Sequence, residues 1–272
     1  MMLHTVLGAS GLIGSHLVKY LRASGKNVLA IGRNDAINWN DKLGHIYYCI
    51  GLTADFRQRT GDTVKAHVNI LQEVLEKARF DSFLYLSSTR VYQDAISTGE
   101  TTSLLVNPNR SDDLYNISKL MGESLCLSTP QANVRVARVS NVITSQKPND
   151  TTNFFDVILD SILKRKYLIL ETDVTSEKDY IDLDDVVTLL GKIAQSGKER
   201  IYNVARGQNT NSAMLIDAIR QQVGFDFTVE VVPGSPVVKF PVINTQRLSS
   251  EFGFSPKTIL DTVQSRVRNI LV

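Results

Sequence analysis

Short apolar runs and longer segments with helical apolar spacing alternate along the first half of the chain. Apolar runs of about four to eight residues bounded by turn residues are typical of buried strands, while apolar positions three and four apart predict amphipathic helices. The expected strands are HTVLG, NVLAIGR, HIYYCIGL, SFLYLSS and VRVARVS. The expected helices are LIGSHLVKYLRASG, TVKAHVNILQEVLEKARF and the segment 112–128. This alternation predicts an α/β fold with a doubly wound parallel sheet covered by helices on both faces.

The pattern loosens after Asn141. FFDVILDSILKRK predicts a helix, KDYIDLDDVVTLLGKIAQ a turn or short strand that leads into a helix, and RIYNVAR a further strand. Four of the seven prolines fall in 208–272, among short mixed elements. We therefore expect a larger domain and a smaller mixed α/β C-terminal lobe. The larger domain would comprise 1–143 and about 180–206, and the lobe about 144–179 and 207–272.

Composition excludes several classes of function. The 272 residues carry a formal net charge of +2, from 30 basic and 28 acidic residues, so no basic excess indicates a nucleic-acid partner. Cys49 and Cys126 have neither metal-ligand nor disulfide spacing, which predicts reduced thiols in a cytoplasmic protein. No apolar run approaches the length of a membrane span, and the first residues have no secretory signal pattern, so we expect no membrane association.

A glycine-rich turn, VLGASGLIGSHL, joins the first expected strand to the first expected helix. Glycines in this position allow a tight turn and let backbone N–H groups approach a pyrophosphate at the helix N-terminus. Glycines also serve strand-to-helix turns that bind nothing, but this context favours a dinucleotide and a Rossmann-type sheet. The expected cofactor-binding residues are Gly8, Ser10, Gly11, Leu12, Ile13 and Gly14, with Gly51 after the third strand.

The end of the second expected strand indicates which dinucleotide binds. An acidic residue there would bind the adenosine ribose hydroxyls of NAD, but this chain has Gly32 followed by Arg33. A guanidinium can pair with the 2′-phosphate of NADP. The sequence therefore favours NADP(H). NAD(H) is the alternative if Arg33 is a solvated loop residue and Asp35 binds the ribose.

Tyr115 and Lys119 lie four residues apart in DDLYNISKLMGE, which is expected to be helical. Such a pair often just covers a helix face. Here SFLYLSS ends upstream in Ser87 and Ser88, and the carboxyl ends of parallel strands are where ligands bind. A serine, a tyrosine and a lysine near a dinucleotide cradle favour a catalytic set over coincidence.

At this point the chain resembles the extended short-chain dehydrogenase/reductase family, whose members mostly act on nucleotide sugars. The resemblance spans residues 4 to about 205 and continues weakly beyond. The matching pieces are the three glycines, Asn69 in AHVNI, LSSTRVY, Tyr115-x-x-x-Lys119, Asn141 in RVSN, and KDYIDLDD. It implies that Ser88, Tyr115 and Lys119 are catalytic. Tyr115 would exchange a proton with the sugar, Lys119 would hold the nicotinamide ribose and lower the pKa of the tyrosine, and Ser88 would steady the reacting oxygen.

The resemblance also narrows the reaction. The family's sugar 4,6-dehydratases have an acidic pair where this chain has Thr89 and Arg90, so we do not expect elimination of water. No cysteine or histidine stands where the 3,5-epimerising members need one. A 4-ketoreductase for a nucleotide-linked 4-keto-6-deoxy sugar, using NADPH, is favoured, with a nucleotide-sugar 4-epimerase that retains NAD as the alternative. A non-catalytic NADP-binding sensor is a third hypothesis, which the complete set of Ser88, Tyr115 and Lys119 opposes.

The remaining expectations concern substrate and assembly. The resemblance places Ser88, Thr89, Asn141 and Asn153 against the sugar nucleotide. It also implies a homodimer through the helices at 63–79 and 112–128. Lys239 is a candidate for an arginine that the family often has near the nucleotide, and Asp184 or Asp185 for the N-cap of the following helix. The four histidines share no ligand spacing, so no metal is expected; they are His4, His16, His45 and His67.

Overall fold

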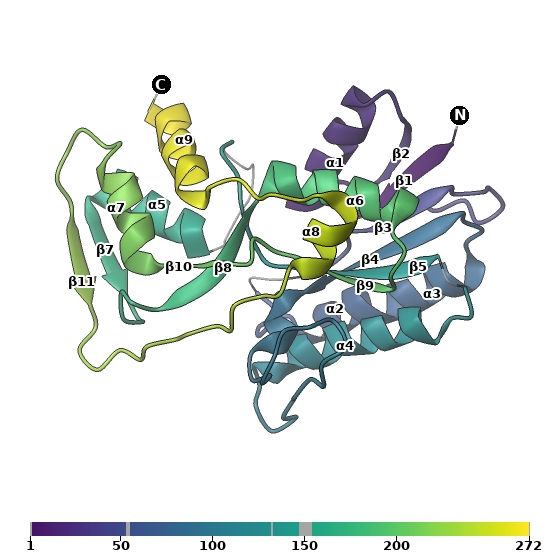
Figure 1. Cartoon of the computed structure of the whole chain (residues 1–272), viewed down its shortest axis with the longest axis horizontal. Helices are drawn as coiled ribbons and strands as arrows, with labels where there is room; N and C mark the ends of the chain where they lie inside the picture. The colour runs from purple at the N-terminus through teal and green to yellow at the C-terminus, as the bar shows by residue number, and fades with distance from the viewer. Residues whose placement is uncertain (1, 53–54, 132, 147–153, 272) are drawn as a thin grey trace.

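The structure, a computed structural model, describes residues 2–52, 55–131, 133–146 and 154–271. Its main feature is a parallel sheet of six strands in the order β2-β1-β3-β4-β5-β9 (Figure 1). The strands are β1 (Leu3–Leu7), β2 (Asn27–Ile31), β3 (His45–Tyr48), β4 (Ser82–Ser88), β5 (Val134–Val139) and β9 (Ile201–Val204). The chain starts at β1, adds the edge strand β2 on one side and then continues from β3 on the other side, so the strand order reverses between β1 and β3, with β4 next to β3.

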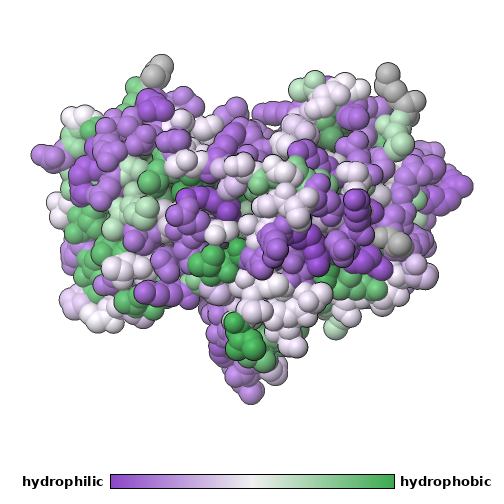
Figure 2. Space-filling model, viewed as in Figure 1, coloured by the Kyte–Doolittle hydropathy of each residue, from purple (hydrophilic) through white to green (hydrophobic). Residues whose placement is uncertain are grey.

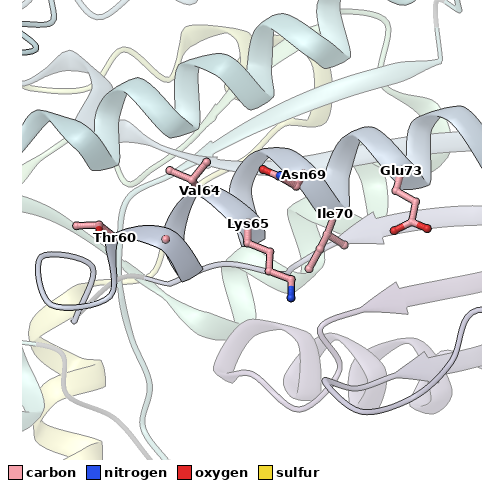
Figure 3. A pocket seen from close by; sticks show the side chains of 7 residues that line it. Thr60, Val64, Lys65, Asn69, Ile70 and Glu73 are labelled. Atoms are coloured by element: carbon pink, nitrogen blue, oxygen red, sulfur yellow. The ribbon is translucent and has the colours of Figure 1, made fainter.

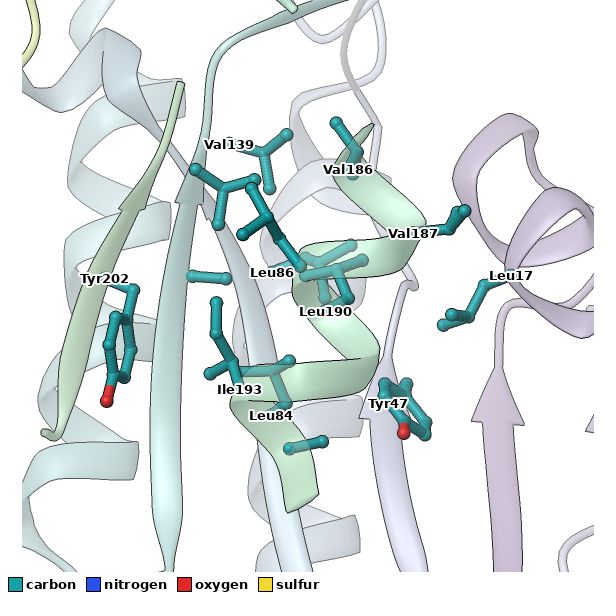
Figure 4. Packing of buried hydrophobic residues seen from close by; sticks show 14 of the residues in the cluster. Leu17, Tyr47, Leu84, Leu86, Val139, Val186, Val187, Leu190, Ile193 and Tyr202 are labelled. Atoms are coloured by element: carbon teal, nitrogen blue, oxygen red, sulfur yellow. The ribbon is translucent and has the colours of Figure 1, made fainter. Parts of the chain in front are cut away.

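Helices cover both faces of this sheet, as the alternating pattern predicts. One face is covered by α1 (Leu12–Ala23) and α6 (Leu183–Ser196), where Leu17 and Leu190 pack with Tyr47 and Leu84 of the strands (Figure 4). The other face is covered by α3 (Ile70–Lys77) and α4 (Asp113–Ser128) (Figure 1). The inner strands β1, β3, β4 and β5 are mostly apolar on both sides because both of their sides are buried. The prediction of a Rossmann-type doubly wound sheet is confirmed.

A second group of elements packs around a core of its own. A three-stranded sheet has the order β10-β8-β6, and β11 pairs with β7. The strands are β6 (Asn141–Ile143), β7 (Tyr167–Leu170), β8 (Glu177–Asp182), β10 (Asn209–Asn211) and β11 (Thr228–Val231); the helices are α5 (Phe154–Arg165), α7 (Ser212–Arg220) and α9 (Ile259–Leu271). One helix of the C-terminal segment, α8 (Gln246–Phe252), instead places Leu248 in the core beneath α1 and α6.

Two local expectations differ from the structure. The single helix expected at 63–79 is divided into α2 (Thr60–Val64), a π-helix (Lys65–Asn69) and α3, a local widening that often occurs at functional sites. The N-cap of α6 is Asp182 rather than Asp184 or Asp185, because β8 continues to Asp182, whose Oδ1 accepts a hydrogen bond from the Asp184 N–H at 2.9 Å.

The viewed surface is mostly hydrophilic, with hydrophobic residues in separate groups (Figure 2). Within the described ranges, no helix is both long enough and apolar enough to cross a membrane.

Candidate active site

The turn between β1 and α1 is built for close backbone approach. Gly8 has φ +84°, and a Cβ on Gly14 would lie only 2.2 Å from the Gly8 carbonyl oxygen. A Cβ on Gly11 would meet the same oxygen at 3.4 Å, which is ordinary contact, so Gly11 is not required by packing. The N-cap of α1 is Gly11, which has no side chain to cap the helix, so the first N–H groups of α1 are left for a ligand. These features fit the pyrophosphate of a dinucleotide.

The turn opens on a cavity of about 630 Å³. Six of the predicted cofactor residues line it, namely Gly8, Ser10, Gly11, Leu12, Arg33 and Gly51. Gly14 serves the turn, and Ile13 packs against the core under α1. Thr144 and Gln146, which follow β6, line the cavity without having been predicted, because no motif marks them. A second cavity of about 580 Å³ runs along α2, the π-helix and α3 and shares Ile70 with the first (Figure 3).

The loop after β2 carries both an acidic and a positively charged side chain, Asp35 and Arg33. Asp35 Oδ2 accepts a hydrogen bond from the Gly32 N–H at 2.7 Å, and a Cβ on Gly32 would lie 3.2 Å from that oxygen. The Asp35 carboxylate thus occupies the space that an acidic side chain at position 32 would take. Arg33 lines the same cavity. Groups suited to a ribose and to a 2′-phosphate are therefore both present.

Ser88, Tyr115 and Lys119 come together at the carboxyl end of β4. Ser88 is the last residue of that strand, and its side chain lies close enough to the Tyr115 hydroxyl to favour the ionised form of the tyrosine. Lys119 follows one turn later on α4 and donates to the Leu86 carbonyl oxygen at 2.8 Å. A Cβ on Gly51 would lie 3.4 Å from Lys119 Nζ, so Gly51 links the cofactor cavity to this group. Tyr115 and Lys119 do not line the cavity themselves, but Lys119 lies directly behind Gly51.

The pKa values of Tyr115 and Lys119 differ from the expectation that the lysine lowers the tyrosine pKa. Burial raises the pKa of Tyr115, and the Ser88 side chain and the Arg90 charge oppose that rise. Burial also lowers the pKa of Lys119 to about 7, against the opposing charges of Glu123 and Cys49. The expectation that Lys119 lowers the tyrosine pKa was therefore incomplete, because Lys119 is itself desolvated and its Nζ is bonded to a carbonyl oxygen.

Two residues beside Tyr115 were not predicted. Arg90 lies in a 3-10 turn at Thr89–Tyr92, with its guanidinium 5.6 Å from the centre of the Tyr115 ring. The only sequence signal is an arginine two positions after Ser88. His67, in the π-helix, meets the Tyr115 ring edge-on at 5.3 Å.

The His67 ring nitrogens both have partners. Nδ1 lies 2.9 Å from Ser118 Oγ, and Nε2 accepts the Leu52 N–H at 3.3 Å. Burial and the Lys119 charge lower the His67 pKa to about 2, which keeps the ring neutral. Among the described residues, no three His, Cys, Asp or Glu side chains gather as a metal site would require.

The predicted substrate residues are less concentrated. Thr89 is buried next to Ser88. Asn141 begins β6, and its side-chain N–H donates to the Asp179 carbonyl oxygen at 2.9 Å. Asn153 lies outside the described residues. Lys178 of β8 lies 5.0 Å from the Phe154 ring centre, and the bridge between Glu177 and Lys239 brings Lys239 to the neighbouring strand position.

Comparison with known proteins agrees with this geometry. The model of the NAD dependent epimerase/dehydratase family matches residues 4–205. GDP-6-deoxy-D-mannose reductase of Pseudomonas aeruginosa is 25% identical over 240 residues, covering 79% of this chain and 78% of that protein.

Two solved structures have the same fold. The structure of RMD from Pseudomonas aeruginosa complexed with NADPH has a TM-score of 0.78 at 20% identity, covering 99% of both chains. UDP-glucuronic acid 4-epimerase from Bacillus cereus, in complex with UDP-glucuronic acid and NAD, has a TM-score of 0.82 at 19% identity, also covering 99% of both chains. The chain belongs to the NAD dependent epimerase/dehydratase family and is an enzyme of the extended short-chain dehydrogenase/reductase type that uses a nicotinamide dinucleotide.

Proposed function

We propose that the protein reduces the C4 keto group of a nucleotide-linked 4-keto-6-deoxy sugar with NADPH. The observation that carries this proposal is the grouping of Ser88, Tyr115 and Lys119 at the carboxyl end of β4, with the cation Arg90 instead of an acid beside them. Without an acidic side chain at positions 89 and 90, the water elimination of a dehydratase lacks its proton donor.

The residues divide the reaction between them. The bound nicotinamide supplies hydride chemistry at the keto carbon. Tyr115 gives its hydroxyl proton to the keto oxygen, so that C=O becomes CH–OH. The Ser88 hydroxyl donates to the same oxygen and steadies the charge that develops there. With the cofactor bound, Lys119 would hold the hydroxyls of the nicotinamide ribose through its Nζ, and the uncapped end of α1 would hold the pyrophosphate.

NADPH is favoured because Arg33 lines the cavity at the end of β2. The relative in the P. aeruginosa structure named above was solved with NADPH. One observation favours the second candidate, a 4-epimerase that retains NAD: Asp35 is already held by the Gly32 N–H, where a ribose ligand is needed. The third hypothesis, a non-catalytic NADP-binding sensor, finds less support because the three catalytic side chains adjoin one another.

A fluorescence titration of the purified protein with NADPH and with NADH separates the first two candidates. We expect freely reversible binding that is much tighter for NADPH. Arg33→Gln should weaken NADPH binding alone, and Asp35→Asn should leave it unchanged. Preference for NADH, loss of NADH binding in Asp35→Asn, or protein purified with NAD already bound would support the epimerase instead.

The assembly and the wider setting are also proposals. We propose a homodimer through the helices at 63–79 and 112–128, whose described parts lie side by side on one face of the sheet (Figure 1). Met121 on α4 is 50% exposed, an apolar side chain that a partner subunit would cover. Light scattering of wild type and Met121→Glu would test this, with a monomer expected for the variant and an unchanged dimer contradicting the proposal.

We further propose that the sheet with α1 to α4 and α6 is the dinucleotide domain and that the β10-β8-β6 group is the substrate lobe. The free thiols Cys49 and Cys126 support a cytoplasmic setting.

A further inference from the structure

Arg90 lies at the active site without a close acidic partner. Its Nε is buried and has no hydrogen-bond partner. A terminal guanidinium nitrogen lies 3.7 Å from Asp112 Oδ2, but Arg57 already holds both Asp112 oxygens at 2.5 and 2.6 Å. Since Arg57 is the nearer partner of that acid, the Arg90 charge is only partly neutralised by Asp112. A partly buried cation in this state interacts more strongly than a solvated one with another group that can become negative.

The group beside Arg90 that can become negative is Tyr115. The Arg90 guanidinium lies over two aromatic rings, 5.0 Å from the centre of Phe56 and 5.6 Å from the centre of Tyr115. The backbone N–H of Arg90 also donates to Ser88 Oγ at 3.2 Å. Both ends of this residue therefore touch the Ser88–Tyr115 pair, one through the backbone and one through the side chain.

The other titratable and charged groups around Tyr115 would neutralise a negative charge on it less than Arg90 would. They are Asp113, Lys119 and Glu123 of α4, Asp112 before it, Arg57 of the loop before α2, His67 of the π-helix, Tyr85 of β4 and, behind Arg90, Lys178 of β8. His67 stays neutral, and Lys119 titrates near pH 7 in the protein without cofactor. Arg90 alone of the two cations nearest Tyr115 keeps its charge at every working pH, because a guanidinium does not lose its proton there.

We propose that Arg90 is a positioning residue that stabilises the negative charge left on Tyr115 after its proton has moved to the sugar oxygen. This inference rests on the proposed proton-donor role of Tyr115. In the step, the O–H bond of Tyr115 breaks, a new O–H bond forms on the sugar, and the phenolate is held by the Ser88 hydroxyl and by the Arg90 charge until solvent returns a proton. Arg90 thus occupies the position that carries an acid in the dehydratases. There the acid donates a proton, whereas Arg90 stabilises a negative charge.

The test is the ionisation of Tyr115, followed by the ¹³Cζ chemical shift of labelled tyrosine against pH and assigned by its loss in Tyr115→Phe. We expect Arg90→Gln to move the ionisation to higher pH by about one unit, the lower end of the range for an opposite charge within about 6 Å. Arg90→Lys should restore part of the shift. Arg59→Gln is the matched control, because it removes an arginine just before α2 that is paired with Asp55 and Asp62, and no contact with Tyr115 is found for it among the described residues.

An Arg90→Gln protein that is natively folded and ionises like wild type would overturn the proposal. If that variant does not fold, Asp112→Asn provides the second test: it keeps Arg90, removes the acid that competes for it, and should move the ionisation to lower pH. An unchanged titration there would equally contradict the inference. Because the titration needs no substrate, failure of the ketoreductase assay and failure of this inference are separate results.

Discussion

The two ends of the active site are built in different ways. The dinucleotide end is made of backbone, with Gly8 at positive φ, Gly14 against the Gly8 carbonyl and an uncapped helix start. The tyrosine end is made of buried ionisable side chains, with Tyr115 and Lys119 each about 5% exposed or less. The first end depends on the absence of side chains, and the second on charges held away from water at a cost in stability.

This difference predicts which changes each end tolerates. A backbone cradle fails when a side chain is added, whatever its chemistry. A site of buried charges loses stability when the partner of one charge is removed. It gains stability when an uncompensated charge is itself removed, although the activity that depends on that charge is then lost.

The largest effect is expected from Tyr115→Phe, which disables the tyrosine end and leaves the cradle intact. Without the phenolic proton, turnover should fall by about 10³-fold or more, within the range for a lost general acid. The dissociation constant for the dinucleotide should stay within about twofold of wild type. Steady-state rates and a fluorescence titration on one protein sample check both. Retained turnover would exclude Tyr115 as the proton donor.

Glu123→Ala tests how far the tyrosine end depends on buried charge. Glu123 is buried, and its carboxylate accepts bidentate hydrogen bonds from the Arg138 guanidinium. It also accepts a hydrogen bond from the Ser87 hydroxyl at 2.6 Å. Its loss leaves the Arg138 charge unpaired, so the free energy of unfolding should fall by about 3–5 kcal/mol. Glu73→Ala, which removes one exposed partner of Lys77, is the control and should change it by less than about 0.5 kcal/mol. Urea unfolding measures both, and equal effects would contradict the distinction.

Gly14→Ala disables the cradle by sterics alone. Its Cβ would overlap the Gly8 carbonyl oxygen at 2.2 Å, so we expect a loss of about 3 kcal/mol and much weaker dinucleotide binding. Gly11→Ala meets that oxygen only at 3.4 Å and should keep the stability while weakening binding, because the methyl group stands where the pyrophosphate approaches. Thermal unfolding and cofactor titration compare the two variants. Equal stability for both would mean that the turn is looser than described.

Lys119→Met sharpens the comparison through pH. The lysine pKa falls from 10.5 to about 7 in the folded protein, so the unfolded chain binds the proton more tightly. Folding is therefore penalised fully below pH 7, and the penalty fades as pH rises toward 10.5. The inactive variant should be more stable than wild type by a few kcal/mol (about 1.4 per pKa unit as the upper limit) at pH 6, with the difference shrinking by pH 10. Denaturant unfolding across this range measures it, and a difference that grows with pH would contradict the account.

The sequence predicts the cradle well because its information is local. Gly8, Gly11 and Gly14 occur within seven residues, directly after an apolar run, and the strands and helices follow from periodicity. Asp35 shows the limit of such reasoning, since it stands three residues past the expected position and returns to Gly32 only through the loop after β2. The sequence therefore favours Arg33 and offers Asp35 only as the alternative ribose ligand.

The tyrosine end could be predicted only in part. The spacing of Tyr115 and Lys119 marks one helix face, but the neighbours that set their charges come from distant segments, such as Arg90 and His67. The π-helix that carries His67 lies in a segment whose apolar spacing predicts an ordinary α-helix. The end of β8 at Asp182 lies in a segment that equally predicts a turn.

The most direct test of the account is a labelling experiment with a nucleotide-linked 4-keto-6-deoxyhexose and NADPH that carries deuterium at nicotinamide C4. If Tyr115, Ser88 and Lys119 form a 4-ketoreductase, mass spectrometry will find one deuterium on C4 of the sugar for each NADPH consumed, and none with Tyr115→Phe. If instead no NADPH is consumed while a nucleotide hexose and its C4 epimer interconvert, the central claim is wrong and the protein is the NAD-retaining epimerase.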